Sequence, residues 1–517
     1  MFYKQTPGAS FMNRKEYRDK VLGCWTGKNI GGTLGAPMEG RRETFDVTGY
    51  VQDLRGNPAP NDDLDLQLVW LRAVEDHGIY NLNERILGEY WLRFITGPWN
   101  EYGIGKFNMV NGLLPPLSGF CSNDQWKNSN GAWIRSEIWA CLFPGEPDEV
   151  ASFAWMDACV DHADDGIYAE IFTATLEAAA FVENDVDKLI DIALARIPAD
   201  CRVARSVGIA RAEFAAGSDW KTARERIVED SRDLGWFQAP ANVAFAVVGL
   251  LWGRGDFGRS ICIAVNCGDD TDCTGATCGA VLGIILGRSR IPETWTAPIG
   301  EGIKTVAVNP YQLNLPETLD ELTDRVLCCK LETDFANPTL MRLTDGETVV
   351  DAELRERLAD GTECAKRVLS KSSRALDFPL LWGTFTVEYG KGPVTAPGET
   401  QTLKLGFHDC MFNCLSLSAE WQLPEGWEMS PGNRQTLMTR EFCGHVLEIR
   451  ITPGLFPAST VHIPVKLELS DRNYPFWITV PFQLAGSIRS EYPLFAPDEP
   501  DARNRLAARR NALLGRS

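Results

Sequence analysis

Two short runs of acidic residues have the clearest chemical potential in this sequence. They occupy residues 61–65 (NDDLD) and 268–273 (GDDTDC), and each precedes an apolar segment. Three carboxylates in one such run repel one another unless a cation joins them. Oxygen ligands at this density suit hard divalent cations such as Mg²⁺, Mn²⁺ or Ca²⁺. The two runs together therefore predict a metal site.

Helix capping is the alternative explanation for either run. One carboxylate or amide is enough to cap a helix and to interact with the positive end of its dipole. Capping therefore accounts for one acid in each run, but not for three. If two cations bind, shared carboxylates would hold them about 3.5–4 Å apart, where they can clamp a substrate and activate water. We expect one or two Mg²⁺ ions, with Mn²⁺ as a possible substitute.

The segment that must position these acids, residues 14–345, is predicted to be an all-α domain. Its apolar residues recur at helical spacing, and strand-like alternation is nearly absent. The clearest helical segments are residues 66–77, 83–94, 148–162, 167–182, 187–195 and 201–215.

Two segments of this domain carry glycine at every fourth position. The glycines are Gly23, Gly27, Gly31 and Gly35 in one segment, and Gly275, Gly279, Gly283 and Gly287 in the other. Glycine destabilises a helix interior by about 1 kcal/mol relative to alanine, so such a ridge needs a reason. A glycine ridge lets another backbone approach closely. We expect two buried, closely packed helices, which could pack against each other.

The sequence changes character after this domain. Residues 346–375 are predicted to be a polar helical connector, residues 376–490 an antiparallel β-sandwich of the immunoglobulin-like kind, and residues 491–517 a basic tail. The polar connector suggests that the sandwich can be separated from the helical domain. The predicted strands are residues 383–389, 401–407, 415–423, 446–451, 461–469 and 476–483.

Several motifs of the helical domain, taken together, resemble those of the ADP-ribosylglycohydrolase family. Residues 23–40 (GCWTGKNIGGTLGAPMEG) are similar to the family's opening helix, which ends in a glutamate, and residues 268–287 (GDDTDCTGATCGAVLGIILG) are similar to its acidic glycine-rich helix. Residues 61–63 (NDD), 128–132 (NSNGA) and 161–164 (DHAD) match three shorter motifs between them. The resemblance spans roughly residues 14–330 and excludes the sandwich.

The resemblance implies a role for each matching residue and a reaction, the metal-dependent hydrolysis of an ADP-ribosyl conjugate at the anomeric carbon of its ribose. The implied catalytic residues are Glu39, Asp62, Asp63 and Asp270. The implied metal ligands are Asp62, Asp63, Asp270 and Asp272, with Asn61 and Cys273 at the two remaining ligand positions. The implied substrate-binding residues are Asn130, Gly131 and His162.

Four residues depart from the family's pattern. Asn61 and Cys273 stand where the family has threonine ligands, Leu64 follows the first acid pair, and Asp269 replaces a glycine. A thiol is a poor ligand for Mg²⁺, so one of the two metal positions is in question, and Asp65 or Asp269 could compensate. Two alternatives stay open: hydrolysis of another N- or O-glycoside, such as a nucleoside or sugar conjugate, and an ADP-ribose- or sugar-binding module without catalysis.

Composition limits the partners and the location. The net charge of -19 argues against a nucleic-acid footprint or an anionic membrane surface. We expect a small-molecule or protein-linked glycoside as the substrate; the sequence leaves the oligomeric state open. The start has no apolar secretory segment and no apolar run is long enough to span a bilayer, while the 15 cysteines show no disulfide framework. A cytoplasmic protein with reduced thiols is the simplest expectation.

Overall fold

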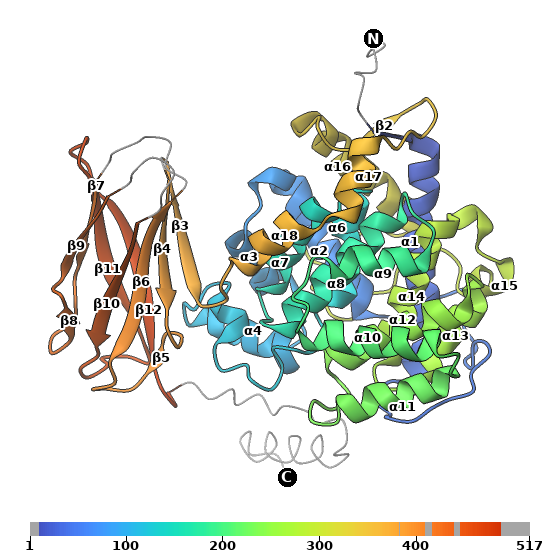
Figure 1. The fold of residues 1–517 in the computed structure, drawn as a ribbon, viewed down its shortest axis with the longest axis horizontal. Helices are drawn as coiled ribbons and strands as arrows, with labels where there is room; N and C mark the ends of the chain where they lie inside the picture. The colour runs from blue at the N-terminus through green and yellow to red at the C-terminus, as the bar shows by residue number, and fades with distance from the viewer. Residues whose placement is uncertain (1–9, 382, 409–415, 439–444, 488–517) are drawn as a thin grey trace.

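A helical domain and a β-sandwich lie side by side in the computed structural model (Figure 1), which describes residues 10–381, 383–408, 416–438 and 445–487. The helical domain contains α1 (Arg14–Gly35), α2 (Asp62–His77), α3 (Glu84–Phe94), α4 (Asn100–Val110), α5 (Leu117–Phe120), α6 (Glu137–Leu142), α7 (Pro147–Ala158), α8 (Asp165–Ala180), α9 (Val186–Leu194), α10 (Arg202–Ala215), α11 (Trp220–Asp230), α12 (Ala239–Gly253), α13 (Phe257–Asn266), α14 (Thr271–Leu286), α15 (Glu293–Thr296) and α16 (Leu319–Ala336). The prediction of an all-α domain is confirmed. The predicted basic tail lies outside the described residues.

The two glycine ridges pack against each other, as the sequence suggested. Helices α1 and α14 run antiparallel. A Cβ atom added to Gly27 would lie 1.9 Å from the carbonyl oxygen of Gly279, and one added to Gly31 would lie equally close to that of Gly275. No side chain larger than hydrogen fits such contacts. The ridge therefore brings the C-terminal end of α1 against the N-terminal end of α14, where the Thr271 hydroxyl donates a 2.8 Å hydrogen bond to the Gly35 carbonyl.

The C-terminal domain is a sandwich of two five-stranded sheets, with strand orders β3-β4-β6-β10-β8 and β5-β12-β11-β7-β9. Neighbouring strands are antiparallel except for β12 and β5. The strands are β3 (Ala375–Leu380), β4 (Gly383–Tyr389), β5 (Val394–Thr395), β6 (Gln401–His408), β7 (Ser416–Trp421), β8 (Glu428–Ser430), β9 (Arg434–Met438), β10 (His445–Thr452), β11 (Thr460–Leu469) and β12 (Phe476–Leu484). The six predicted strands are present. The four that were not predicted lie at the sheet edges, and two of them, β5 and β8, are only two and three residues long.

Two short helices, α17 (Ala352–Ala359) and α18 (Thr362–Leu369), connect the domains. The parallel pair β1 (Phe11–Asn13) and β2 (Arg342–Thr344) joins the two ends of the helical domain. Within the described residues, no helix combines the length and apolarity needed to cross a membrane.

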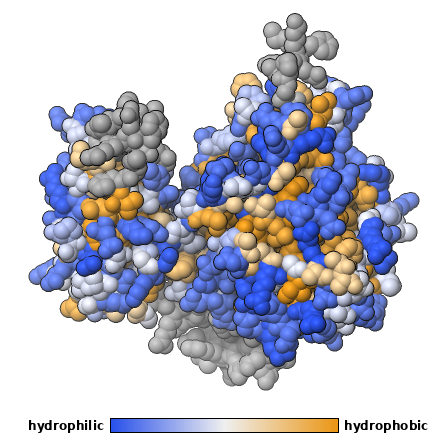
Figure 2. Space-filling view, viewed as in Figure 1, coloured by the Kyte–Doolittle hydropathy of each residue, from blue (hydrophilic) through white to orange (hydrophobic). Residues whose placement is uncertain are grey.

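The boundary between the domains is apolar, which the polar connector did not suggest. Leu113 and Leu117, from the helical domain, are fully buried in the same hydrophobic cluster as the sandwich core. Arg85 stacks on the ring of Phe378, and its guanidinium donates a 2.7 Å hydrogen bond to the Asp377 carbonyl. The surface visible in Figure 2 is mixed, with hydrophilic residues around hydrophobic patches on both domains. The contacts thus favour two domains that stabilise each other.

Candidate metal centre

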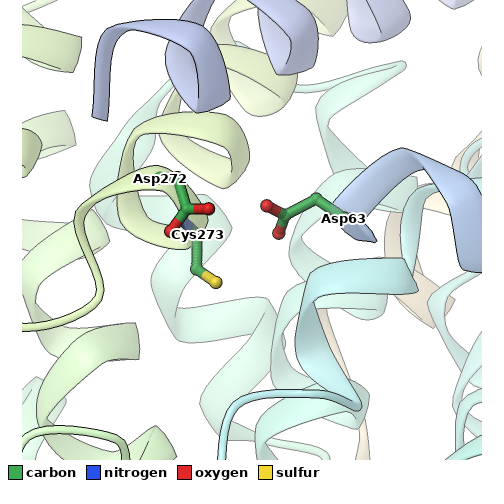
Figure 3. A group of neighbouring side chains, drawn as sticks. All are labelled: Asp63, Asp272 and Cys273. Atoms are coloured by element: carbon green, nitrogen blue, oxygen red, sulfur yellow. The ribbon is translucent and has the colours of Figure 1, made fainter. Parts of the chain in front are cut away.

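Acidic side chains from three separate segments meet where α1, α2 and α14 converge. Two groups have ligand atoms that all lie within 4.8 Å of one another: Glu39 with Asp270 and Asp272, and Asp63 with Asp272 and Cys273. Figure 3 shows Asp63 reaching from α2 toward Asp272 and Cys273 in the first turn of α14. Asp272 is common to both groups, so the two acidic runs of the sequence form one cluster.

The first run is shaped by the start of α2. The Asn61 side-chain oxygen caps this helix by accepting a 2.7 Å hydrogen bond from the Asp63 amide. Asp62 is half-buried, and its Oδ2 accepts a 3.1 Å hydrogen bond from the Tyr102 hydroxyl. Burial, with added repulsion from Asp272, raises the pKa of Asp62 to about 6. Asn61 thus acts as a helix cap, while Asp62 is held at the less buried side of the cluster.

The second run is held from the opposite side by asparagines. The Asn130 side-chain amide donates a 2.6 Å hydrogen bond to Asp270 Oδ2, and the Asp270 backbone amide donates a 3.1 Å hydrogen bond to Asn242 Oδ1. Burial first, and then repulsion by Asp272, raises the pKa of Asp270 well above its usual range. Asn130 therefore orients a member of the cluster.

The cluster offers unpaired oxygen atoms for a cation. Both carboxylate oxygens of Asp63 and Oδ1 of Asp270 are buried, and among the described residues they have no hydrogen-bond partner. Buried polar atoms normally have partners, so oxygens of this kind suit an ion or a water molecule as their partner. Since the potential metal ligands are mainly carboxylate oxygens, the residues present fit a hard divalent cation.

Glu39 follows the short 3₁₀ turn that ends α1. The segment that follows Glu39 is hydrogen-bonded to the residues before α14, because the Gly40 amide donates a 2.9 Å hydrogen bond to the Asp269 carbonyl. Much of the Glu39 side chain is exposed, although its carboxylate belongs to the cluster. Repulsion from Asp272, together with the loss of water around the carboxylate end of the side chain, raises the pKa of Glu39 to about 9. By its exposed side chain, Glu39 is the acid of the cluster that is most open to solvent.

Two further acids of the two runs, Asp65 and Asp269, contact other parts of the helical domain. Asp65 Oδ2 accepts hydrogen bonds of 2.6 and 2.7 Å from the backbone amides of Val306 and Ala307. Asp269 lies 3.5 Å from the Arg42 guanidinium and belongs to neither group of potential ligands. These contacts do not favour the idea that Asp65 or Asp269 compensates for a lost ligand.

Gly131 and His162 lie in a buried network behind the cluster. A Cβ atom on Gly131 would lie 2.4 Å from Oε1 of Glu101, so only glycine fits there. His162 is fully buried, with Nδ1 2.8 Å from Asp161 Oδ1 and Nε2 3.2 Å from Ser129 Oγ. His162 thus contacts the loop that contains Asn130 and Gly131.

Three residues near the cluster were missed by the sequence analysis: Tyr102, Asn242 and Lys28. Nothing near Tyr102 or Asn242 in the sequence marks them. Lys28 had a signal, because a lysine lies within the glycine ridge of a helix that was expected to be buried. It is 1 % exposed, and its Nζ lies 4.0 Å from Asp63 Oδ1.

One comparison with known protein families matches the helical domain. The family model for ADP-ribosylglycohydrolase matches residues 13–332, which is more than half of the chain and contains every acid of the cluster. No curated protein matches the chain. Because this family match covers more than half of the chain, the chain belongs to the ADP-ribosylglycohydrolase family.

Proposed function

We propose that the chain is a Mg²⁺-dependent glycoside hydrolase that cleaves the anomeric bond of ADP-ribosyl conjugates. The observation that carries the proposal is the convergence of Glu39, Asp63, Asp270 and Asp272, with unpaired buried oxygens, inside a domain of this family. Mn²⁺ is the expected substitute for Mg²⁺. The substrate would be a small molecule or a protein that carries the ADP-ribosyl group.

We assign cation binding to Asp62, Asp63, Asp270 and Asp272. Cys273, which belongs to one of the two groups, and Asn61, which caps α2, are weaker candidate ligands. When bound, a divalent cation supplies a Lewis acid that can orient the ribose hydroxyls. Asn130 holds Asp270 in place through its 2.6 Å hydrogen bond.

The least buried acids are assigned the contact with substrate. Glu39 is open to solvent and Asp62 is half-buried, whereas Asp63, Asp270 and Asp272 are buried. Tyr102 orients the Asp62 carboxylate, which is suited to accept a proton from an attacking water. For Gly131 and His162, which the sequence suggested as substrate-binding residues, we propose a supporting role, because they pack against the loop around Asn130.

A second candidate function is hydrolysis of a different N- or O-glycoside on the same scaffold. Cys273 favours this candidate, because a thiol within the cluster changes the donor set from the one that the family resemblance implies. A binding module without catalysis is a third possibility. The acids of the cluster argue against this third possibility, since binding alone does not require them.

A substrate panel tests these functions. ADP-ribosylated protein, ADP-ribosylated nucleic acid, a nucleoside and aryl glycosides would each be incubated with Mg²⁺ or with EDTA, and product release would be followed by chromatography. We expect release of ADP-ribose with Mg²⁺ only, and no release by an Asp62→Asn variant. Cleavage of only the nucleoside or the aryl glycosides would favour the second candidate, and binding without cleavage would favour the third.

We also propose a cytoplasmic location. The 12 cysteines that the structure describes are all free thiols, as expected in a reducing compartment. Cell fractionation with an antibody to the chain would test this location.

A further inference from the structure

A buried lysine lies directly beside the acidic cluster. Lys28 projects from α1, between the glycines that contact α14, and is 1 % exposed. Its Nζ lies 4.0 Å from Asp63 Oδ1 and donates a 2.7 Å hydrogen bond to Glu137 Oε1. A positive charge therefore already lies next to one of the carboxylates that would hold a metal ion.

The lysine cannot easily turn away, because its partner is fixed. Glu137 is fully buried at the start of α6, and its second oxygen accepts a 2.8 Å hydrogen bond from Gln67 Nε2. The same Gln67 accepts a 2.8 Å hydrogen bond from the Ile138 amide. Lys28 is thus locked in a buried network, in which its ammonium points to the Asp63 side of the cluster.

The two potential ligand groups consequently differ in charge. The group of Glu39, Asp270 and Asp272 consists of three carboxylates. The group of Asp63, Asp272 and Cys273 includes a thiol, which is a poor ligand for Mg²⁺. A divalent cation bound to Asp63 would also face the Lys28 ammonium a few ångströms away, and charges of the same sign repel strongly at a buried position.

We propose that the cluster holds one divalent cation, bound mainly by Asp270 and Asp272 on the side of Glu39, and that Asp63, alone among the four acids assigned to cation binding, faces the Lys28 ammonium in place of a second cation. This inference rests on the proposed function in one respect, namely that the cluster binds a cation. It adds that the number of cations is one and names the residue responsible.

The number of bound Mn²⁺ ions tests the inference directly. The full-length protein would be titrated with Mn²⁺ after EDTA treatment, and bound metal would be counted by elemental analysis and by electron paramagnetic resonance. We expect one Mn²⁺ per chain, with the spectrum of an isolated ion. Two ions about 3.5–4 Å apart would instead give a spin-coupled spectrum.

A double variant tests the role of Lys28. Lys28→Met together with Glu137→Gln removes both charges of the buried pair and leaves neither partner as an unpaired ion. We expect this variant to bind a second Mn²⁺ beside Asp63, with a spin-coupled spectrum. Lys28→Arg keeps the positive charge, so we expect that variant to bind only one ion.

A matched control is available in α16. Lys330 is also fully buried and lies 2.6 Å from Asp334, but neither residue belongs to the acidic cluster. We expect Lys330→Met with Asp334→Asn to leave the count at one. If the wild-type protein binds two Mn²⁺ ions, or if the Lys28 double variant binds only one, this inference is wrong, while the proposed function is unaffected. A count of zero in the wild-type protein would overturn the metal site of the proposed function as well.

Discussion

The side-chain amide of Asn130 donates a 2.6 Å hydrogen bond to Asp270 Oδ2, and the side-chain oxygen of Asn130 accepts a 3.0 Å hydrogen bond from the indole of Trp133. Both residues of the first hydrogen bond are buried. The Trp133 contact determines which end of the Asn130 amide faces Asp270. A loop that is distant in sequence from α14 therefore sets the orientation of a proposed metal ligand.

We expect Asn130→Ala to weaken Mn²⁺ binding and turnover by about 10–100-fold, which is the usual effect of removing a residue that orients a metal ligand. The fold should remain, because the alanine leaves only a small cavity. Calorimetric titration with Mn²⁺ and a thermal melt measure the two effects. An unchanged metal affinity would show that Asp270 does not need Asn130, or is not a ligand.

Metal removal should make the stability of the protein depend on pH in a defined direction. The folded-state pKa of Asp62 is about 6, above its unfolded value of about 3.9. The folded chain then binds more protons than the unfolded chain in this range, so stability falls as the pH rises through about 6. We expect the Tm in EDTA to be higher at pH 5 than at pH 8, with the same direction from the raised pKa values of Asp63 and Asp270.

Added Mg²⁺ should reverse this trend, because a cation can replace the protons. The Tm gain on adding Mg²⁺ should therefore be larger at pH 8 than at pH 5. Scanning calorimetry at both pH values, with and without EDTA, measures it. An equal Mg²⁺ effect at both values would contradict a site built from these carboxylates.

Two acids of the same run should respond differently to substitution. We expect Asp62→Asn to lower turnover at least about 100-fold, the scale of losing a group that stabilises the transition state, with little change in stability. We expect Asp65→Ala to lower the free energy of unfolding by about 1–3 kcal/mol, because the buried Ala307 amide loses its acceptor. Product release and denaturant melts on both variants would separate the effect on turnover from the effect on stability. Equal losses of turnover and of stability in the two variants would contradict the different contacts of Asp62 and Asp65.

Replacing Cys273 with threonine should improve the cation site next to Asp63. A hydroxyl oxygen is a better ligand than a thiol for Mg²⁺, and the two side chains are close in size. We expect no gain while Lys28 is present, and a higher affinity for the second cation when Lys28→Met and Glu137→Gln are also present. Calorimetric titration measures this change. A lowered Tm with unchanged affinity in both backgrounds would show that Cys273 only packs.

Removing the sandwich should destabilise the helical domain. A chain that ends at Arg374 exposes Leu113 and Leu117, which are fully buried in the cluster they share with the sandwich. Each buried leucine contributes about 1.5–3 kcal/mol. We expect a lower Tm and poor solubility, with solubility improved by Leu113→Gln and Leu117→Gln in the shortened chain. A soluble fragment with the Tm of the full chain would mean that the interface contributes no stability.

The local part of this structure could be predicted from the sequence alone. Helical periodicity predicted the all-α domain, and alternation predicted six of the sandwich strands, because both patterns arise from neighbours along the chain. The glycine ridges predicted a close helix pair, since only a near backbone explains glycine at every fourth helical position. The acidic runs, in turn, indicated a metal cluster at the ends of helices.

What only the tertiary structure decided is which side chains face one another. Asp63 and Asp65 are two positions apart on α2, but helical geometry turns them to different sides, so one joins the cluster and the other anchors the backbone at Val306 and Ala307. Lys28 comes beside Asp63 only through the packing of α1 near the start of α2. Likewise, Leu113 and Leu117 read as ordinary apolar residues until the sandwich covers them. Such contacts join segments that are distant along the chain, and no local pattern of residues encodes them.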